Sequence, residues 1–185
     1  MTERTTAATD DLEVIRRVGS GDRAAFRVLV ERYQGPLHAF VLRMVRRPAV
    51  AEELVQEAFV RAFRAAPGFK PTAAVSTWLF HIAARLAMNE AARSHHRHEV
   101  AGALPEVPAG ARSPHDEFER KDLSRAIETA LLQLPARQRA AVILARFEEL
   151  PYREIAKVLG VSEGAVESLL QRARQALARL LDPVQ

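Results

Sequence analysis

Apolar and polar residues follow one another along the chain with the period of an amphipathic α-helix. The pattern is clearest in residues 51–64, where one face is polar and charged. The opposite face carries apolar residues at i, i+3 and i+4 spacing, namely Ala51, Leu54, Val55, Ala58, Phe59, Ala62 and Phe63. Pro67–Gly68 is predicted to end this helix. Residues 69–76 are predicted to form a loop, and a further helix begins near Ser76 or Thr77 and runs out through the SHHRH cluster.

The segment before residue 51 has the same periodicity. Asp22 is a suitable N-cap for a helix whose apolar stripe is Phe26, Leu29, Val30 and Tyr33. Gly35–Pro36 is predicted to interrupt or kink that helix. A second apolar stretch at 37–45 stops near Pro48. Residues 1–19 are interpreted as a polar N-terminal segment.

The pattern of apolar and polar residues in the second half of the chain predicts four helices. The first carries Leu123, Ile127, Leu131 and Leu134 and ends at Pro135, and the next covers residues 136–147. A short helix at 152–159 is followed by Gly160 as a C′ residue. Ser162 then caps a last helix over roughly 163–181. A short helix, a Gly-centred turn and a capped second helix predict a helix-turn-helix, although an ordinary helical hairpin has the same pattern.

Composition separates these two halves. Residues 100–114 read VAGALPEVPAGARSP, with three prolines, two glycines and no helical period. Such a segment is predicted to be a flexible linker. The predicted fold is therefore all-α, with two small helical domains joined by a flexible linker. The expected division is 1–19 for the N-terminal segment, 20–97 for the first domain, 98–117 for the linker, and 118–185 for the domain with the helix-turn-helix.

Charge is distributed unevenly over these parts. Residues 20–97 carry 12 basic and 6 acidic side chains, whereas residues 98–119 carry 1 basic and 5 acidic. Residues 120–185 carry 11 basic and 8 acidic. Two basic blocks that flank an acidic connector favour a nucleic-acid partner, but two ordinary solvated domains explain the same balance.

Several classes of function are disfavoured. The chain has no cysteine, which excludes disulfides, thiolate metal sites and a cysteine nucleophile. It has no secretory signal pattern and no apolar run long enough to span a bilayer, so we expect a cytoplasmic protein without membrane insertion. His95, His96 and His98 could bind zinc, but a solvated basic helix end is the preferred interpretation, and no metal or cofactor is expected. No catalytic constellation is present, so an enzyme is not expected.

The motifs resemble those of a known family. The C-terminal half is similar to region 4 of bacterial RNA-polymerase sigma factors of the extracytoplasmic-function (ECF) group. The matching motifs are Leu134–Pro135, Arg137, Arg139, Glu154-Ile155-Ala156 and Arg172-Ala173-Arg174. The first half resembles region 2 of the same family. There the matching motifs are AEELVQEAFVRAFR at 51–64, Thr77-Trp78-Leu79, Ile82-Ala83 and Arg93.

The resemblance implies the partners. A sigma factor binds core RNA polymerase through the β′ clamp helices and the β flap, binds promoter DNA, and is often held by an anti-sigma factor, which can keep it at the inner membrane. It directs promoter-specific initiation and performs no chemistry itself. In the family the acidic helix at 51–64 meets the β′ clamp helices. The residues expected to do so here are Glu53, Leu54, Gln56 and Glu57, although by themselves they would be read as a solvated charged face.

The resemblance also implies two DNA surfaces. The −10 element would be met by the loop at 69–76 and the helix after it, although at its spacing from Ile82 Trp78 is more readily interpreted as a core residue, and Asn89 could simply be solvated. The −10 candidates are Phe69, Lys70, Trp78, His81, Arg85, Asn89 and Arg93. The last two helices would meet the −35 element. The −35 candidates are Arg153, Lys157, Glu163, Glu167, Ser168, Gln171, Arg172 and Arg174.

The sequence departs from the family at two positions of the last helix. Many relatives carry a basic residue in place of Glu167, and often Arg in place of Leu169. Glutamate accepts a hydrogen bond from cytosine but repels phosphate, so a different −35 preference is expected. The main alternative function is a free-standing helix-turn-helix regulator, which would have no need of the 51–64 helix. A sigma-like protein that only titrates an anti-sigma factor is a further alternative, disfavoured by the retained Lys70, Arg172 and Arg174.

Overall fold

The computed structural model describes the backbone of residues 2–101 and 125–181, and the side chains of 10–94 and 125–181. Within these ranges the chain is helical apart from short connections, and no strand forms. The first half contains α1 (Thr2–Gly19), α2 (Arg23–Val45), α3 (Pro48–Ala65), the short 3₁₀ helix η1 (Ala66–Gly68) and α4 (Val75–Ala101). The second half contains helical residues 125–133, α6 (Ala136–Arg146), α7 (Tyr152–Leu159) and α8 (Glu163–Leu181). The all-α prediction is confirmed.

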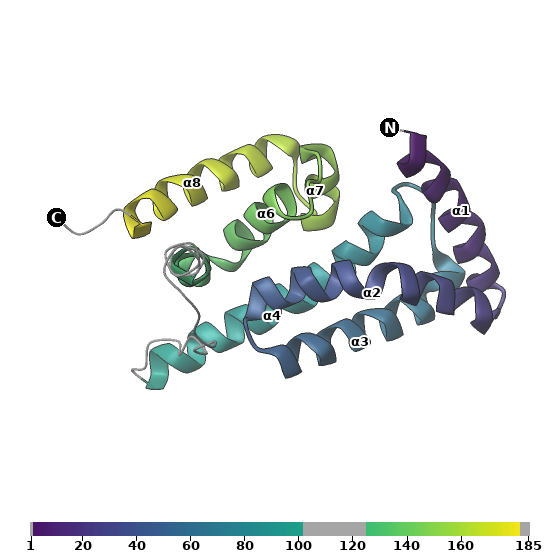
Figure 1. Cartoon of the computed structure of the whole chain (residues 1–185), viewed down its shortest axis with the longest axis horizontal. Coiled ribbons are helices and arrows are strands. Elements are labelled where there is room, and N and C mark those ends of the chain that lie inside the picture. Colours follow the sequence, from purple (N-terminus) through teal and green to yellow (C-terminus); the bar gives the residue numbers. More distant parts are fainter. Residues whose placement is uncertain (1, 102–124, 182–185) are drawn as a thin grey trace, which may run out of the picture.

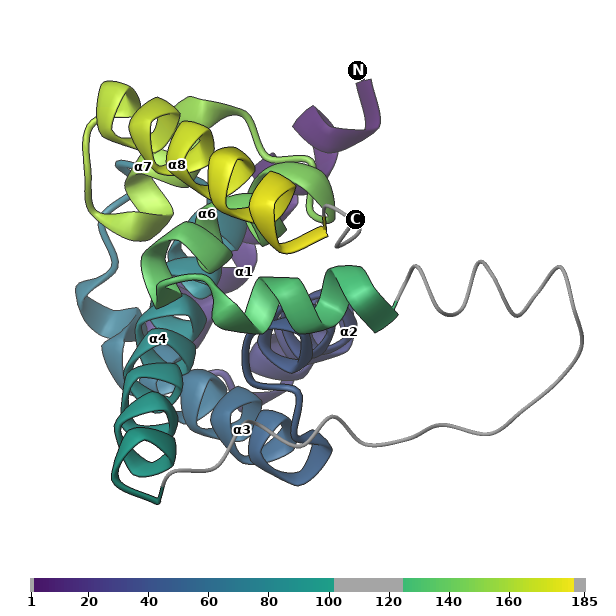
Figure 2. The same ribbon diagram turned by 90° about the vertical axis from the view of Figure 1, so that its left-hand side faces the viewer.

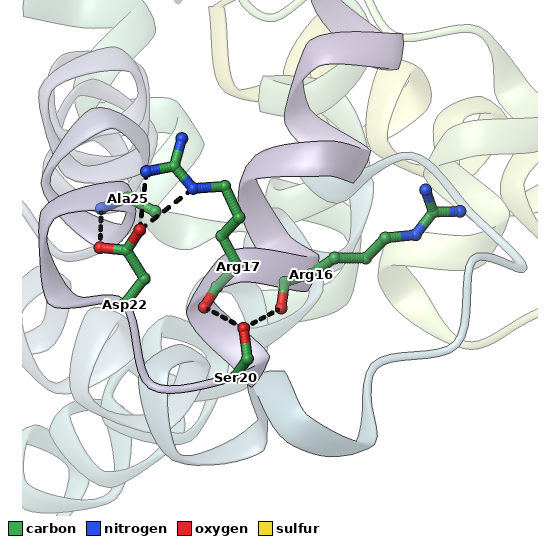
Figure 3. A network of polar contacts seen from close by, with 5 residues as sticks. All are labelled: Arg16, Arg17, Ser20, Asp22 and Ala25. Carbon is green, nitrogen blue, oxygen red and sulfur yellow. Dashed lines mark hydrogen bonds and ion pairs between the residues drawn. The ribbon is translucent and has the colours of Figure 1, made fainter.

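The turn between α1 and α2 is held by local polar contacts (Figure 3). The Asp22 carboxylate accepts a hydrogen bond from the Ala25 amide at 3.0 Å, which confirms its N-cap role. Arg17 donates to the same carboxylate through Nη2 at 2.7 Å. The amide of Ala25 and then the guanidinium of Arg17 lower the pKa of Asp22. Gly21 takes φ +96° at this turn, a conformation that glycine adopts without strain.

Residues 1–19 were interpreted as a polar N-terminal segment separate from the first domain, but residues 2–19 form the helix α1, which packs on that domain. Val14, Ile15 and Val18 of this helix are buried, and they pack into the core with α2 and α4. Asp11 is also buried, and its carboxylate accepts hydrogen bonds from the Tyr33 hydroxyl and the Arg32 guanidinium. Burial and these contacts with Asp11 raise the pKa of Tyr33. A short apolar face among many polar residues was therefore sufficient for a packed helix.

Of the two outcomes predicted at Gly35–Pro36, the interruption is wrong, since α2 continues through Pro36 to Val45, and the kink stays a prediction. A proline inside a helix costs about 3 kcal/mol. Leu29 precedes this proline, Leu37 and Phe40 follow it, and all three are fully buried. Their packing offsets the cost, so tertiary contacts decide the structure of this segment.

The end of the first half differs from the prediction by a few residues. α4 begins at Val75, close to the expected start, and continues to Ala101. Residues 98–101 of the predicted linker are therefore helical. The remainder of that linker, 102–117, and the helix start at 118–124 lie outside the described residues.

The second half forms the predicted helix-turn-helix. Gly160 takes φ +64° and ends α7, and the Val161 amide donates to the Ala156 carbonyl at 3.0 Å. The Ser162 hydroxyl accepts from the Ala165 amide at 3.2 Å and caps α8. Ile155 and Val166 are fully buried and fix the crossing of the two helices.

The two halves pack against each other. Figure 1 shows α6, α7 and α8 lying over the layer formed by α2, α3 and α4, and Figure 2 gives the same arrangement from the side. α7 packs on α4, and α6 packs on both α2 and α4. One hydrophobic core joins them, with Leu79 of α4 in the same cluster as Leu144 and Val158. The two helical units expected from the sequence are therefore docked together in this structure.

Candidate nucleic-acid and polymerase interfaces

The −10 candidates lie along one side of α4 and on the loop before it. Trp78, His81, Arg85 and Asn89 recur at three- and four-residue spacing, so they share one face of the helix, here called the α4 stripe. Arg85 and Asn89 are exposed, as is Lys70 on the loop. Together with Lys70 of the loop, the α4 stripe thus combines cations and flat side chains, which is a suitable surface for a single strand of DNA.

Trp78 is half-buried and belongs to a packed aromatic pair. Its ring lies edge-on to that of Phe69, with centroids 5.0 Å apart and an interplanar angle of 61°. Both rings pack against the main core. The loop before α4 is therefore fixed to the helix by this pair, and one side of each ring remains partly exposed.

The N-terminal end of the α4 stripe contacts α7. The His81 ring donates from Nδ1 to the Val158 carbonyl at 2.8 Å, since a carbonyl oxygen can only accept. One turn earlier, the buried Thr77 hydroxyl donates to the Glu154 carboxylate at 2.7 Å. Sequence reasoning did not anticipate either contact, because each joins residues 77 positions apart.

Arg93, at the far end of the −10 candidates, has a carboxylate partner inside the protein. Its guanidinium lies 3.2 Å from Glu90, which also pairs with Arg47 at the start of α3. Glu90 is buried, so these two arginines balance a charge that would otherwise be costly. A DNA phosphate at Arg93 would have to share this cation with Glu90.

The polymerase candidates occupy the outer face of α3. Glu53 and Gln56 are exposed, Leu54 is half-buried against the core, and Glu57 pairs with Arg61 at 2.7 Å. Val60 lies one turn further along and is 42% exposed, which is unusual for a large apolar side chain in this protein. The sequence analysis did not select Val60. The face is therefore acidic at its N-terminal end with an apolar residue beside it.

The −35 candidates lie mainly on the outer surface of the helix-turn-helix. Glu163, Glu167, Ser168, Gln171 and Arg172 of α8 are all exposed. Arg172 donates from Nε to the Ser168 carbonyl at 3.2 Å. On α7, Arg153 is exposed, and Lys157 pairs with Glu154 at 3.1 Å.

Leu169 is only 9% exposed and packs in the core of the helix-turn-helix. Many relatives have an arginine at this position, but in this chain the position faces the core and not DNA. Glu167 is exposed, so of the two departures it is the one that can change the DNA surface. The expected effect on −35 preference stays a prediction about Glu167.

Arg174 does not lie with the other −35 candidates of α8. It lines an open groove between α6 and α8, together with Arg146. Apolar side chains supply most of the remaining lining, including Val142, Leu170, Leu177 and Leu181. The sequence analysis missed this groove. The available signal was the apolar series Leu170, Leu177 and Leu181, which does not coincide with the buried stripe of Val166, Leu169 and Ala173.

Arg139, identified as part of a family motif, is a buried structural residue. Its guanidinium donates to the carbonyls of Leu131 at 2.9 Å and Leu134 at 3.2 Å, and to that of Leu132. It also donates to the Met44 carbonyl of α2 at 2.6 Å. Burial without a carboxylate lowers the pKa of Arg139 to about 10. This one side chain thus ties helix 125–133 to α6, and α6 to the first half.

The comparisons with known proteins agree with these features. Residues 29–97 match the model for sigma-70 region 2, and residues 124–177 match that for sigma-70 region 4. A protein with both regions is a sigma factor of RNA polymerase. The chain is 32% identical to the RNA polymerase sigma-H factor of Pseudomonas aeruginosa, over 94% of this chain and 95% of the relative. It is 34% identical to the ECF sigma factor SigM of Mycobacterium tuberculosis, over 92% and 84% of the two chains. The chain therefore belongs to the ECF sigma factors.

Solved structures with the same fold are complexes with a second protein. One is CnrH in complex with the cytosolic domain of CnrY, with a TM-score of 0.70 and 27% identity, covering 95% of this chain and 99% of CnrH. Another is the sigma factor RpoE bound to the anti-sigma factor NepR from Bartonella quintana, with a TM-score of 0.65 and 26% identity. It covers 86% of this chain and 98% of RpoE. In the part of the present chain that the structure describes, no helix is long and apolar enough to cross a membrane.

Proposed function

We propose that this protein binds core RNA polymerase and directs it to promoters whose −10 and −35 elements are read by the α4 stripe and by α8. The observation that carries the proposal is the presence, in one chain, of an exposed acidic face on α3 and an exposed polar face on a capped recognition helix. A recognition helix contacts base edges with its N-terminal residues, which here include Glu167 and Ser168.

Each predicted surface is assigned to a partner by its chemistry. The outer face of α3 would meet a basic surface of the polymerase through Glu53 and Gln56, with Val60 supplying apolar contact. The groove between α6 and α8 would take an apolar segment of the polymerase, and the β flap is the partner that family resemblance suggests. Arg146 and Arg174 would then border this contact rather than read DNA.

We further propose that an anti-sigma factor holds the protein until a signal releases it. The support is that both RpoE and the structurally similar CnrH were solved in complex with another protein, which is an anti-sigma factor for RpoE. Because polymerase and promoters are the proposed partners, the cytoplasm is the proposed place of action. The protein supplies recognition, and the polymerase supplies the chemistry.

Run-off transcription with core polymerase on a library of genomic promoters tests this proposal. Transcripts should start at a defined set of promoters only when the protein is added. The alternative, a regulator that binds DNA without polymerase, predicts binding to a specific duplex but no added transcript. Specific duplex binding together with unchanged transcription would therefore overturn the proposed function in favour of that alternative.

A further inference from the structure

A buried carboxylate on α4 brings together two arginines from different elements. Glu90 is buried, and its two carboxylate oxygens accept hydrogen bonds from Arg47 and Arg93. Arg47 is the residue before α3, and Arg93 lies one turn beyond Glu90 on α4. Since both guanidinium groups bond to the same carboxylate, they lie side by side although they are far apart in the sequence. They are called the Arg47–Arg93 pair below.

The cations of this group are more accessible than its anion. Side-chain exposure is 11% for Glu90, 42% for Arg47 and 70% for Arg93. Two guanidinium cations this close would repel each other, and the carboxylate offsets that repulsion. A partner that approaches from solvent therefore meets two cations held in one place, while the carboxylate that holds them lies behind.

Both guanidinium groups keep donors for a ligand. Among the described contacts, Arg47 bonds to Glu90 through Nη2 and Arg93 bonds to it through Nη1. An arginine carries further N–H donors in a rigid planar fork, whose geometry matches the oxygens of a phosphate. Two such forks beside each other can hold one phosphate group from two directions. The chemistry of the Arg47–Arg93 pair thus fits an oxyanion.

The position of the pair indicates which oxyanion it meets. Arg85, Asn89 and Arg93 follow one another at four-residue spacing, so Arg93 extends the α4 stripe by one turn. Arg47 adds a cation from the connection between α2 and α3, which widens this surface toward α3. A DNA strand that follows the α4 stripe would reach the pair with one of its phosphates. This continuity favours a phosphate of DNA over a free anion.

We propose that Arg47 and Arg93, held side by side by Glu90, form a binding site for one phosphate group of promoter DNA. Arg47 is the new member of this site, since it is not among the −10 candidates and belongs to no helix stripe. The inference rests on the proposed function for its ligand, whereas the pairing rests on the contacts above. Phosphate contacts position a protein on DNA without reading its sequence. The site should therefore strengthen binding to all sequences alike.

The salt dependence of DNA binding tests the site, because it counts the phosphates that a protein neutralises. The probe is a fluorescent forked duplex of random sequence, which offers phosphates of single-stranded and of paired DNA. The whole chain is titrated with it at several salt concentrations. Arg47→Met and Arg93→Met should each weaken binding about two- to fivefold, the range of an exposed charge pair. The double variant should lower the salt slope by about one, because both arginines hold the same phosphate.

Arg61→Met is the matched control. Arg61 is also an exposed arginine paired with a carboxylate, Glu57 at 2.7 Å, but it lies on the outer face of α3. Its loss should leave the salt slope nearly unchanged. Arg47→Lys is the second variant if Arg47→Met fails to fold. A lysine keeps the charge beside Glu90 but lacks the planar fork, so this variant should weaken binding about twofold at a nearly unchanged slope.

Two results would overturn the proposal. One is an affinity of the folded Arg47 variant equal to that of Arg61→Met, which would mean that Arg47 only ties α3 to α4. The other is a fall of about two in the salt slope of the double variant, which would mean that the two arginines meet separate phosphates. Run-off transcription by the unchanged protein decides the proposed function separately. Transcription together with an inert Arg47 would overturn this inference alone, and the predicted slopes without transcription would overturn only the proposed function.

Discussion

The two proposed DNA surfaces differ in what covers them. On α8, Ser168, Gln171 and Arg172 are exposed, and no residue of the first half bonds to them among the described contacts. On α4, His81 of the stripe is bonded to α7, and Arg93, one turn beyond the stripe, is shared with Glu90. The recognition helix is thus ready for a duplex, whereas the surface for single-stranded DNA is partly occupied by the protein itself.

This difference follows from the chemistry of the two ligands. A duplex presents a rigid groove, which an exposed helix can enter without rearrangement of the protein. A single strand needs flat side chains and cations, and on α4 one of these flat side chains, His81, is bonded to α7. The α4 stripe therefore doubles as a docking surface, and the predictions below test how independent the two surfaces are.

The largest effect is expected at Arg139, which joins the two halves. Arg139→Met keeps much of the apolar stem but removes the side-chain donor of four carbonyls, of which that of Leu131 still accepts from the Leu134 amide at 3.1 Å. We expect a loss of about 3 kcal/mol in the free energy of unfolding. That corresponds to a fall of roughly 6–12 °C in Tm for a chain of this size, measured by circular dichroism. Arg137→Met, at an exposed position of the same helix, should change stability by less than about 0.5 kcal/mol. Equal stability of both variants would contradict the structural role of Arg139.

The next largest effect is expected in the affinity of the exposed surface of α8 for duplex DNA. If Arg172 reads guanine, Arg172→Ala should cost roughly 1–3 kcal/mol of duplex affinity and relax preference at one base position. If it only touches phosphate, all sequences should be weakened about equally, and the salt slope should fall by about one. Binding to a randomised −35 library at two salt concentrations separates these outcomes.

Glu167 provides the contrasting variant on the same helix. Glu167→Arg removes a charge that repels phosphate, so affinity should rise and the preferred sequence should shift. The same −35 library measures both changes. Unchanged binding and preference for both Arg172→Ala and Glu167→Arg would mean that this face of α8 does not meet DNA.

The sequence predicted one of these two surfaces better than the other. The recognition helix was predictable because its start, its cap at Ser162 and its polar face are all local features. Contacts such as Thr77 to Glu154 were not predictable, because no periodicity reports which helices meet across 77 residues. The continuous α2 was missed for a related reason, since packing on either side of Pro36 overrides a local rule. The groove with Arg174 was missed because Leu170, Leu177 and Leu181 of α8, which line it, do not belong to the buried stripe of that helix.

A smaller effect is expected at the polymerase face. Glu53→Ala with Gln56→Ala should weaken binding to core polymerase by about 1 kcal/mol, because exposed charge contacts are individually weak. The fold should persist, since both side chains are exposed on α3. A pull-down titration with core polymerase gives the affinity. Glu52→Ala is a suitable control on the same helix, and an unchanged affinity for the double variant would remove the assignment of this face.

The smallest effect is the pH dependence of docking. Burial opposes ionisation of Glu154, but hydrogen bonds from Thr77 and Lys157 outweigh it and lower its pKa below the ordinary 4.5. A carboxyl with a lowered pKa stabilises the docked state above its ordinary pKa, and this contribution is lost as the pH falls through the lowered value.

Glu148, which lies beside Arg43 in the same contact region, behaves in the opposite way, because burial raises its pKa. As the pH falls from 7, protonation of Glu148 should first favour docking slightly, and protonation of Glu154 should then open the domains. Distance distributions between spin labels on Glu52→Cys of α3 and Arg179→Cys of α8, both exposed positions, should show the opening when recorded from pH 7 to pH 3.5. Glu154→Gln should remove only the acid-induced part of it, and opening with the same pH profile in that variant would assign the effect to other carboxylates.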